Sequence, residues 1–503
     1  MFLPVLSAFL QFLSFPPAEL YYLSLIALVP LFWFLARETD PWRLGVGVLL
    51  YRALFLLAAG SYIPEPMLVV SELAFFLPFI FFIIVLKKYG VRRSFFVGLA
   101  VLAFFLTECL AAQFAPLPSF VVLSGLPLAA TPFVGLARFG WGIVSGPYVV
   151  TGFALLINFL SACLLLNVSG RTDGARRFGR RARVVLFLLG IALVAGYGAA
   201  SAPRAETGTS AKTLRVAIFS TGGGYDDASG PSAFSTTTAP LIKERVAAVL
   251  ANAGEKLGEF RPELTVFPEA LFALFYAGDV NVEARERFGI VNAGTVISGF
   301  QDFAKEHRTA VFTGLTTLNA DGEKYRSAIL IDAEGQLSAV SDKYYLTTGS
   351  EWWPLGTWVP FYWRWSLWFL PPHTRQDAFV ALSPTGQYTP AAEPFAPMTL
   401  GDLVLAPLLC SEGHYPKPYR ALVASGADLF ISNSSDGWLG FSVRQFQRET
   451  VWLKTLYAVS SGRPVVIAGK QDAAGIAYPS GIFEGVYPQG ADALTPFTKV
   501  LEL

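Results

Sequence analysis

The stretch Leu405–Pro416 reads Leu-Ala-Pro-Leu-Leu-Cys-Ser-Glu-Gly-His-Tyr-Pro. Its apolar run ends at Cys410, and polar residues and a glycine follow at once. This pattern is typical of a buried strand that delivers a side chain to the end of a sheet. The other two cysteines, Cys109 and Cys163, lie in long apolar segments. We therefore expect the rest of the chain to anchor, activate and supply the Cys410 thiol.

Composition divides the 503-residue chain into two parts. Hydrophobic residues make up 53% and charged residues 15%, and the apolar excess lies in residues 1–200. We predict a transmembrane helical domain at 1–200, a linker at 201–213 and an α/β catalytic domain at 214–503. The net charge of +1 gives no sign of a nucleic-acid partner. The three histidines lack metal-ligand spacing, so no metal or other cofactor is expected.

Seven apolar segments predict membrane-spanning helices, because most approach the ~20 residues that cross a bilayer core. They lie at about 3–15, 18–36, 43–62, 66–86, 94–112, 146–168 and 183–200. The first segment lacks the basic start and the small-residue cleavage site of a signal peptide. We therefore expect it to remain in the protein.

Basic residues gather in alternate loops between these segments. The loops after the second, fourth and sixth segments carry Arg37, Arg43, Lys87, Lys88, Arg92, Arg93, Arg171, Arg176, Arg177, Arg180, Arg181 and Arg183. Arg138 is the exception in the other loops. Basic loops favour the cytoplasmic side, so the N-terminus is predicted there and residues 214–503 on the outer face.

Three charged residues, Arg52, Glu72 and Glu108, fall within the predicted spans. A charge in hydrocarbon is costly unless it is paired or faces a polar cavity. Two interpretations stay open: an ion pair inside the helical bundle, or the polar wall of a headgroup cavity.

Short apolar runs alternate with helical patterns after residue 213, which predicts a layered α/β domain. The expected strands are Leu214–Phe219, Leu264–Phe267, Ala310–Gly314, Ala328–Asp332, Leu403–Leu409, Leu429–Ser432 and Val465–Ala468. The expected helices are Pro240–Leu257, Val296–Lys305, Tyr415–Ser425 and Val443–Ser460.

Three motifs carry candidate chemistry: Phe267-Pro268-Glu269, Asp342-Lys343-Tyr344 and Cys410-Ser411-Glu412. Each has a structural alternative. Glu269 could be a solvated carboxylate at a strand end, Lys343 could pair with Asp342 on the surface, and Cys410 could be a small buried hydrophobic residue.

Taken together, these motifs resemble the nitrilase superfamily, and the seven apolar segments before them resemble the apolipoprotein N-acyltransferase family in particular. Supporting features are Glu351, Asn433, the Asp436-Gly437-Trp438 run, and Phe15-Pro16-Pro17 near the N-terminus. The resemblance implies an αββα sandwich with a Glu269–Lys343–Cys410 catalytic set. Glu351, Ser411, Glu412, Asn433 and Trp438 would support the set or line the substrate pocket.

The resemblance also implies a reaction and a location. A phospholipid would give a fatty acyl chain to Cys410 as a thioester, and the chain would then pass to the N-terminal amine of a diacylglyceryl-cysteine lipoprotein. Glu269 would exchange the protons, and Lys343 would stabilise the oxyanion. The protein would be a multi-pass protein of the bacterial inner membrane, with a periplasmic catalytic domain.

Several features depart from that family. Ser411 stands where an aromatic residue is usual, two extra residues separate Asn433 from Asp436, and no apolar span follows the catalytic domain. A membrane-anchored amidase or acyltransferase with a different acceptor is the alternative.

The stretch 351–372 is crowded with aromatic residues. Aromatic side chains at this density suit the membrane–water interface, where the stretch would form a lid over the thiol. A loop that packs into the domain core is the alternative interpretation.

Overall fold

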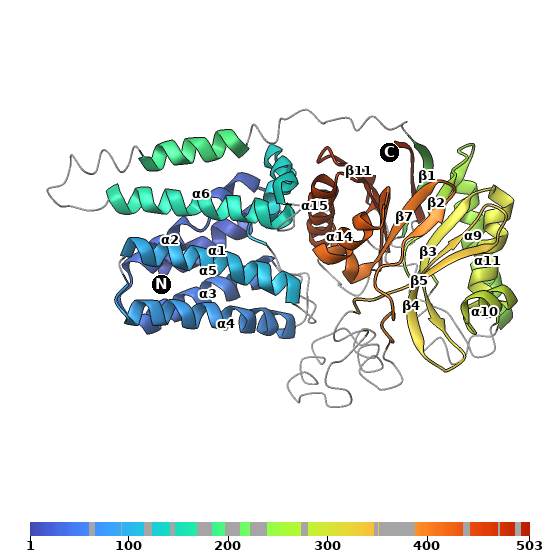
Figure 1. Ribbon diagram of the computed structural model, residues 1–503, viewed down its shortest axis with the longest axis horizontal. Helices are drawn as coiled ribbons and strands as arrows, with labels where there is room; N and C mark the ends of the chain where they lie inside the picture. The colour runs from blue at the N-terminus through green and yellow to red at the C-terminus, as the bar shows by residue number, and fades with distance from the viewer. Residues whose placement is uncertain are drawn as a thin grey trace. The chain divides into compact units, whose positions relative to one another are not determined.

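A computed structural model describes residues 1–59, 66–91, 93–114, 123–140, 146–168, 184–196, 212–221, 239–272, 280–346, 351, 388–435, 443–470, 473–487 and 494–503. The chain forms two compact units. Unit 1 comprises Met1–Ala205 with Arg448–Ser460, and unit 2 comprises Glu206–Gln447 with Ser461–Leu503. Figure 1 shows unit 1 mainly in blue to green and unit 2 mainly in yellow to red.

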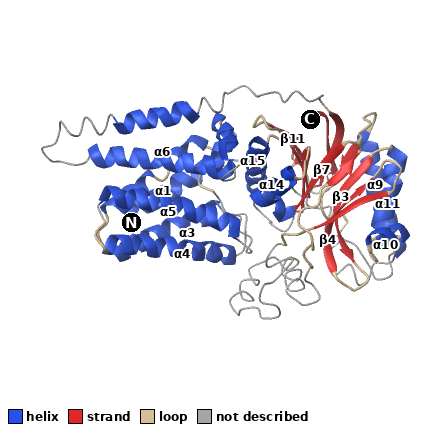
Figure 2. Cartoon of the chain, in the orientation of Figure 1, coloured by secondary structure: helices blue, strands red, loops and turns tan. Residues whose placement is uncertain are grey.

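Unit 1 is helical wherever it has regular structure (Figure 2). Its α-helices are α1 (Phe2–Ser14), α2 (Val29–Arg37), α3 (Pro41–Ala59), α4 (Pro66–Lys88), α5 (Arg93–Phe114) and α6 (Gly146–Val168), with a further helix at Val184–Gly196. Short 3-10 helices η1 (Tyr21–Leu25), η2 (Leu126–Ala130) and η3 (Pro132–Gly140) connect them. Each predicted span contains helical structure, and the second is divided between η1 and α2.

Among the described residues, one helix, Gly146–Leu166, is long and apolar enough to cross a bilayer by length and composition. Shorter apolar helices cover Phe2–Ser14, Tyr21–Arg37, Phe95–Leu110 and Val184–Gly196. The seven-span arrangement therefore stays a prediction.

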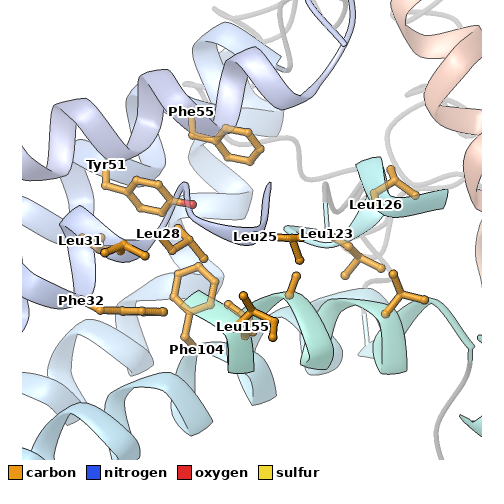
Figure 3. Packing of buried hydrophobic residues seen from close by; sticks show 14 of the residues in the cluster. Leu25, Leu28, Leu31, Phe32, Tyr51, Phe55, Phe104, Leu123, Leu126 and Leu155 are labelled. Carbon is orange, nitrogen blue, oxygen red and sulfur yellow. The ribbon is translucent and has the colours of Figure 1, made fainter. Parts of the chain in front are cut away.

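Aromatic and leucine side chains fill the centre of unit 1. Figure 3 shows Phe32, Tyr51, Phe55 and Phe104 converging with leucines from neighbouring helices. The ring centroids of Tyr51 and Phe55 lie 6.2 Å apart in a stacked arrangement, and those of Phe32 and Phe104 lie 6.4 Å apart edge to face. Such aromatic pairs add to the stabilisation that apolar burial provides.

An ion pair is buried among these rings. Arg52 Nη1 lies 3.6 Å from Glu108 Oε1, and both side chains are fully buried. Ser124 Oγ donates to Glu108 Oε1 at 2.6 Å, and the Arg52 guanidinium lies 4.3 Å from the centre of the Phe76 ring. This geometry supports the ion-pair interpretation of the intraspan charges. The side chain of Glu72 lies outside the described part of the chain.

Helix α15 (Val443–Ser461) contributes residues 448–460 to unit 1. The Trp452 ring lies 6.2 Å from that of Phe15 and 5.6 Å from that of Tyr21, and Arg448 forms an ion pair with Glu19. Unit 1 is therefore built from two separate parts of the sequence.

In the described residues, the strands of unit 2 are β1 (Thr213–Thr221), β2 (Leu264–Val266), β3 (Ala310–Leu318), β4 (Lys324–Ile331), β5 (Leu337–Asp342), β6 (Met398–Leu400), β7 (Leu403–Leu409), β8 (Leu429–Ser435), β9 (Val465–Lys470), β10 (Ala474–Ala477), β11 (Phe483–Val486) and β12 (Leu494–Glu502). One half pairs in the order β5-β4-β3-β2-β1-β12, and the other in the order β6-β7-β8-β9-β10-β11. Within the part of the chain that the structure describes, the pairing of Thr221 with Lys470 joins the halves. The strands within β1–β3 and within β7–β9 run parallel.

The two halves of the sheet pack on each other through a core supplied by strands. This cluster combines Val216, Val266 and Phe312 from one half with Leu405 and Ile431 from the other. Because side chains alternate between the two faces of a strand, the intervening residues of β1 and β3 face the opposite way. The halves therefore form the two inner layers of a sandwich.

Helices cover the outer faces of unit 2. On the β1–β3 side, α9 (Ala239–Leu257) and α11 (Gly294–His307) share a second core with Ala217, Phe219 and Val311, and α10 (Val282–Phe288) lies nearby (Figure 1). On the β8 side, Tyr419 of α14 (Pro416–Ala424) packs on Phe430 at 4.7 Å between ring centroids. The expected αββα layering is thus present in the described residues.

The predicted strands and helices of this unit are confirmed, with ends that shift by a few residues. Strands β5, β6, β10, β11 and β12 and helix α10 were not predicted from the sequence. Apart from β12, the missed elements are at most seven residues long, and β12 has only two buried residues in nine. Such elements carry little hydrophobic periodicity.

Candidate active site

Glu269 lies just beyond the carboxyl end of β2 and is only 2% exposed. Ala270 N donates to Gly314 O at 2.8 Å, which pins this turn to β3. Asn433 Nδ2 on β8 donates to Phe267 O at 2.5 Å and holds the turn from the other side. The alternative of a solvated carboxylate is therefore wrong.

Lys343 follows β5 and is fully buried. Its Nζ donates to Glu351 Oε2 at 2.7 Å, and its backbone N donates to Arg326 O at 2.7 Å. Asp342 instead accepts a hydrogen bond from Ser327 Oγ at 2.5 Å. The alternative of a surface pair between Lys343 and Asp342 is wrong, because the ammonium lies inside the domain.

Cys410 begins the 3-10 helix η6 (Cys410–His414), directly after β7. Its φ of 46° lies in the left-handed region, which a residue with a side chain rarely adopts. Such strain costs about 1–3 kcal/mol and gathers at functional sites. The residue is partly exposed, which disfavours the interpretation of Cys410 as a buried structural residue.

Ser411 and Glu412 fasten this turn to the segment that carries Lys343. Ser411 Oγ donates to Tyr345 O at 2.9 Å. Glu412 Oε1 accepts from the backbone N of Tyr344 at 2.8 Å and of Tyr345 at 3.2 Å, and Oε2 accepts from Leu409 N at 3.1 Å. Both side chains therefore hold the turn after β7 against the segment that follows β5.

Arg326 on β4 lies between two of the candidate carboxylates. It was not predicted from the sequence as a site residue. Its Nε lies 3.8 Å from Glu269 Oε1 and 3.5 Å from Glu351 Oε1. Lys470, a buried residue at the end of β9, donates through Nζ to Ala270 O at 2.9 Å. Three carboxylates, at positions 269, 351 and 412, thus share the site with three cations, at positions 326, 343 and 470.

Burial and charge oppose each other at this site. Burial raises the pKa of Glu269, and the cations Lys343, Arg326 and Lys470 counter only part of that rise. Burial alone would lower the pKa of Lys343, but Glu351 first, then Cys410 and Glu269, raise the pKa overall. Lys343 is therefore an ammonium at neutral pH, close enough to Cys410 to interact electrostatically with a thiolate.

Burial also raises the pKa of Glu412 to about 7, although Lys343 and the backbone N–H groups of Leu409, Tyr344 and Tyr345 lower it in part. Glu412 is committed to backbone contacts. The carboxylate that holds the Lys343 ammonium directly is that of Glu351, which accepts from Lys343 Nζ at 2.7 Å.

The structure thus brings Glu269, Lys343 and Cys410 to the carboxyl ends of β2, β5 and β7, with Glu351, Ser411, Glu412 and Asn433 around them. Open α/β sheets commonly bind ligands at the carboxyl ends of their strands. Trp438 and residues 352–372, the predicted lid, lie outside the described residues.

Comparison with known proteins adds a family match. Residues 237–481, which contain the candidate triad, match the family model described as carbon-nitrogen hydrolase. This part of the chain is therefore similar to that family. The match agrees with the resemblance to the nitrilase superfamily noted from the three motifs.

Relatives of the chain include an apolipoprotein N-acyltransferase of Geobacter metallireducens. It is 24% identical over 259 residues, which cover 51% of this chain and 43% of that relative. A carbon-nitrogen hydrolase from Helicobacter pylori is 13% identical, with a TM-score of 0.38, and covers 57% of this chain and 89% of its own. An amidase from Nesterenkonia sp. is 15% identical, with a TM-score of 0.38, and covers 58% and 90%.

Proposed function

We propose that the protein is a cysteine-dependent acyltransferase. Cys410 is the nucleophile, Glu269 the general base and Lys343 the electrostatic stabiliser. One observation carries the proposal: the buried Lys343 ammonium interacts electrostatically with both the strained Cys410 thiol and the buried Glu269 carboxylate, within residues that match the carbon–nitrogen hydrolase family. Nucleophilic catalysis by a thiol requires a base to remove its proton and a cation where negative charge develops.

In the first step, Glu269 takes the proton from Cys410 Sγ, and the thiolate attacks the carbonyl carbon of an ester. Lys343 stabilises the oxyanion of the tetrahedral intermediate, and Glu351 holds the Lys343 ammonium at 2.7 Å. The carbon–oxygen bond then breaks, and Glu269 returns the proton to the leaving alkoxide. The acyl chain remains on Cys410 as a thioester.

In the second step, an amine attacks the thioester carbon and gives a proton to Glu269. The carbon–sulfur bond breaks, the amide leaves, and Glu269 returns its proton to the sulfur. Because donor and acceptor react in turn, two bulky substrates need not be bound together.

The proposed donor is a phospholipid, and the proposed acceptor is the N-terminal amine of a diacylglyceryl-cysteine lipoprotein. The name of the Geobacter relative supports this choice. So does the outside of unit 1, where large apolar residues such as Phe2, Phe81, Phe95, Phe187 and Val194 are each more than 60% exposed. A helical bundle with an apolar exterior suits a bilayer.

We further propose that unit 1 contributes seven membrane spans and that the catalytic domain at 214–503 faces the periplasm. The alternation of basic loops supports this orientation in a bacterial inner membrane.

The test is mass spectrometry of purified protein after incubation with a phospholipid that carries a labelled acyl chain. We expect an acyl thioester on a peptide containing Cys410, discharged by a diacylated lipopeptide with a free N-terminus. Cys410→Ala should show no adduct at all. An unmodified wild-type protein, or equal labelling of the Cys410→Ala variant, would contradict the proposal.

Amide hydrolysis, or transfer to a different acceptor, is the second candidate. The dense set of charged groups beside the thiol favours it, because Arg326, Lys343, Glu269 and Glu351 suit a small polar substrate. In that case Cys410 would react with polar amides, and the lipopeptide would leave the thioester intact.

A further inference from the structure

Arg326 is a charged residue of the site that the proposed mechanism does not use. We propose that it is a positioning residue. It holds the Glu351 carboxylate against Lys343 and the Glu269 carboxylate ready to accept a proton from Cys410. This inference rests on the proposed function, because it takes Glu269 as the base that serves Cys410.

The guanidinium bridges the two carboxylates. Arg326 Nε lies 3.8 Å from Glu269 Oε1 and 3.5 Å from Glu351 Oε1. The other oxygens of these carboxylates have separate environments. Glu351 Oε2 accepts from Lys343 Nζ at 2.7 Å, whereas Glu269 Oε2 is buried and has no hydrogen-bond partner in the described part of the chain. That second oxygen of Glu269 is the atom available to take a proton.

The guanidinium is itself fixed from behind. Arg326 Nη1 donates to Thr316 Oγ1 at 3.0 Å, and the hydroxyls of Thr316 and Tyr388 share a hydrogen bond at 3.2 Å. The Tyr388 ring lies 4.8 Å from the guanidinium carbon, and Tyr388 N donates to Glu351 O at 2.8 Å. A planar cation held in this way suits two carboxylates at once. Arg326 is therefore built into the site as a fixed cation.

The charges around Glu269 explain why a fixed cation is needed. Lys343, Arg326 and Lys470 favour the ionised carboxylate, whereas burial and Glu351 oppose it. Lys343 is already paired with Glu351, and Lys470 donates to the Ala270 carbonyl. Two carboxylates that share one buried site cannot both keep their charge without a cation between them. Loss of Arg326 would therefore leave Glu269 protonated over a wider pH range.

The test compares pH profiles of thioester formation for wild-type protein, Arg326→Gln and Arg326→Lys. In wild type, the rate rises with pH as Glu269 loses its proton. In Arg326→Gln this rise should move upward by about 1–3 pH units, the usual effect of one close opposite charge on a carboxyl group. Arg326→Lys should give a smaller shift, because it keeps the positive charge but loses the planar group that places Nε between both carboxylates.

Lys324→Gln is the matched control. Lys324 lies on the same strand, and its Nζ sits 4.2 Å from the centre of the same Tyr388 ring, but it forms no ion pair in the described residues. Its profile should coincide with that of wild type. Thermal unfolding of each variant shows whether the fold is kept, and Arg326→Lys carries the comparison if Arg326→Gln does not fold.

An equal loss of rate at every pH in both Arg326 variants would overturn the inference. A purely structural role would lower the rate without changing the pH at which the rate rises. The double variant Glu269→Gln/Arg326→Gln should show no shift beyond that of Glu269→Gln, and an additional shift would also overturn it. Failure of the proposed function is recognised separately: Cys410→Ala would then form the same adduct as wild type.

Discussion

At the scale of single residues, the site depends on close approaches that local sequence does not encode. Gly314 on β3 is an example, because a Cβ at this position would lie 3.0 Å from Glu269 Cγ and 2.9 Å from Leu409 Cδ2. Because Gly314 has no side chain, the Glu269 side chain can pack directly against β3. Nothing in the local pattern of β3 marks this glycine as part of a site.

Gly314→Ala should displace Glu269 by a few tenths of an ångström and lower the rate of thioester formation by about 10- to 100-fold, since catalysis is sensitive to small misplacements. The measurement is the single-turnover rate of acylation, with circular dichroism to show that the fold is kept. Gly98→Ala on α5 is the control, because its new methyl would approach only Phe159, at 3.9 Å. Equal rates for both variants would contradict the role given to Gly314.

Glu269, Lys343 and Cys410 could be singled out from the sequence because each directly follows an apolar run that predicts a strand or belongs to a motif with a family resemblance. Arg326 could not be found in this way. It alternates with Lys324 at the start of β4, and such a pattern is usual for the solvent face of a strand. Only the tertiary arrangement turns this arginine toward two buried carboxylates.

At the scale of elements, hydrogen bonds hold η6 and the segment after β5 together. Glu412 joins them through three backbone N–H groups, from Tyr344, Tyr345 and Leu409. Strands β1–β4 and β7–β9 could be predicted because each contains an apolar run that is mainly buried. The connection between η6 and β5 could not, because its partners lie more than sixty residues apart.

Glu412→Gln should change how stability depends on pH. Burial raises the native pKa of Glu412 from its ordinary value of 4.5 to about 7. The native state therefore binds this proton more tightly than the unfolded state does. The resulting stabilisation is complete below pH 4.5 and is lost as the pH rises through 7, by on the order of 3 kcal/mol.

Glutamine has no such titration, so the unfolding free energy of wild type relative to Glu412→Gln should fall between pH 5 and pH 8. Denaturant unfolding of detergent-solubilised protein across this range measures the difference. A difference that stays constant with pH would show that Glu412 does not titrate in this range.

At the scale of the whole molecule, unit 1 draws its helices from residues 1–205 and from Arg448–Ser460 of α15. Trp452 packs with Phe15 and Tyr21, so a helix that begins at Val443, well after the thiol in the sequence, helps to build the helical unit. From the sequence, this helix was expected in the catalytic domain alone. Hydrophobic periodicity gives the exposed and buried faces of a helix but does not identify the element that covers them.

The basic residues in alternate loops of unit 1 predict how the chain is oriented across a membrane. Tyr89, 81% exposed, lies between α4 and α5 beside the basic residues Lys87 and Lys88, whereas Val500, 52% exposed, lies on β12 of unit 2. If basic loops stay in the cytoplasm and the catalytic domain faces outward, these two positions lie on opposite sides of the bilayer. Single cysteines placed there distinguish the two sides.

In a background with Cys109, Cys163 and Cys410 replaced by alanine, a membrane-impermeant maleimide should label Val500→Cys in intact spheroplasts. Tyr89→Cys should be labelled only after detergent opens the membrane. The alanine background without an added cysteine should stay unlabelled and measures non-specific reaction. Labelling of Tyr89→Cys in intact cells, with Val500→Cys protected, would reverse the orientation and move the Cys410 thiol to the cytoplasm, away from any outer-face lipoprotein.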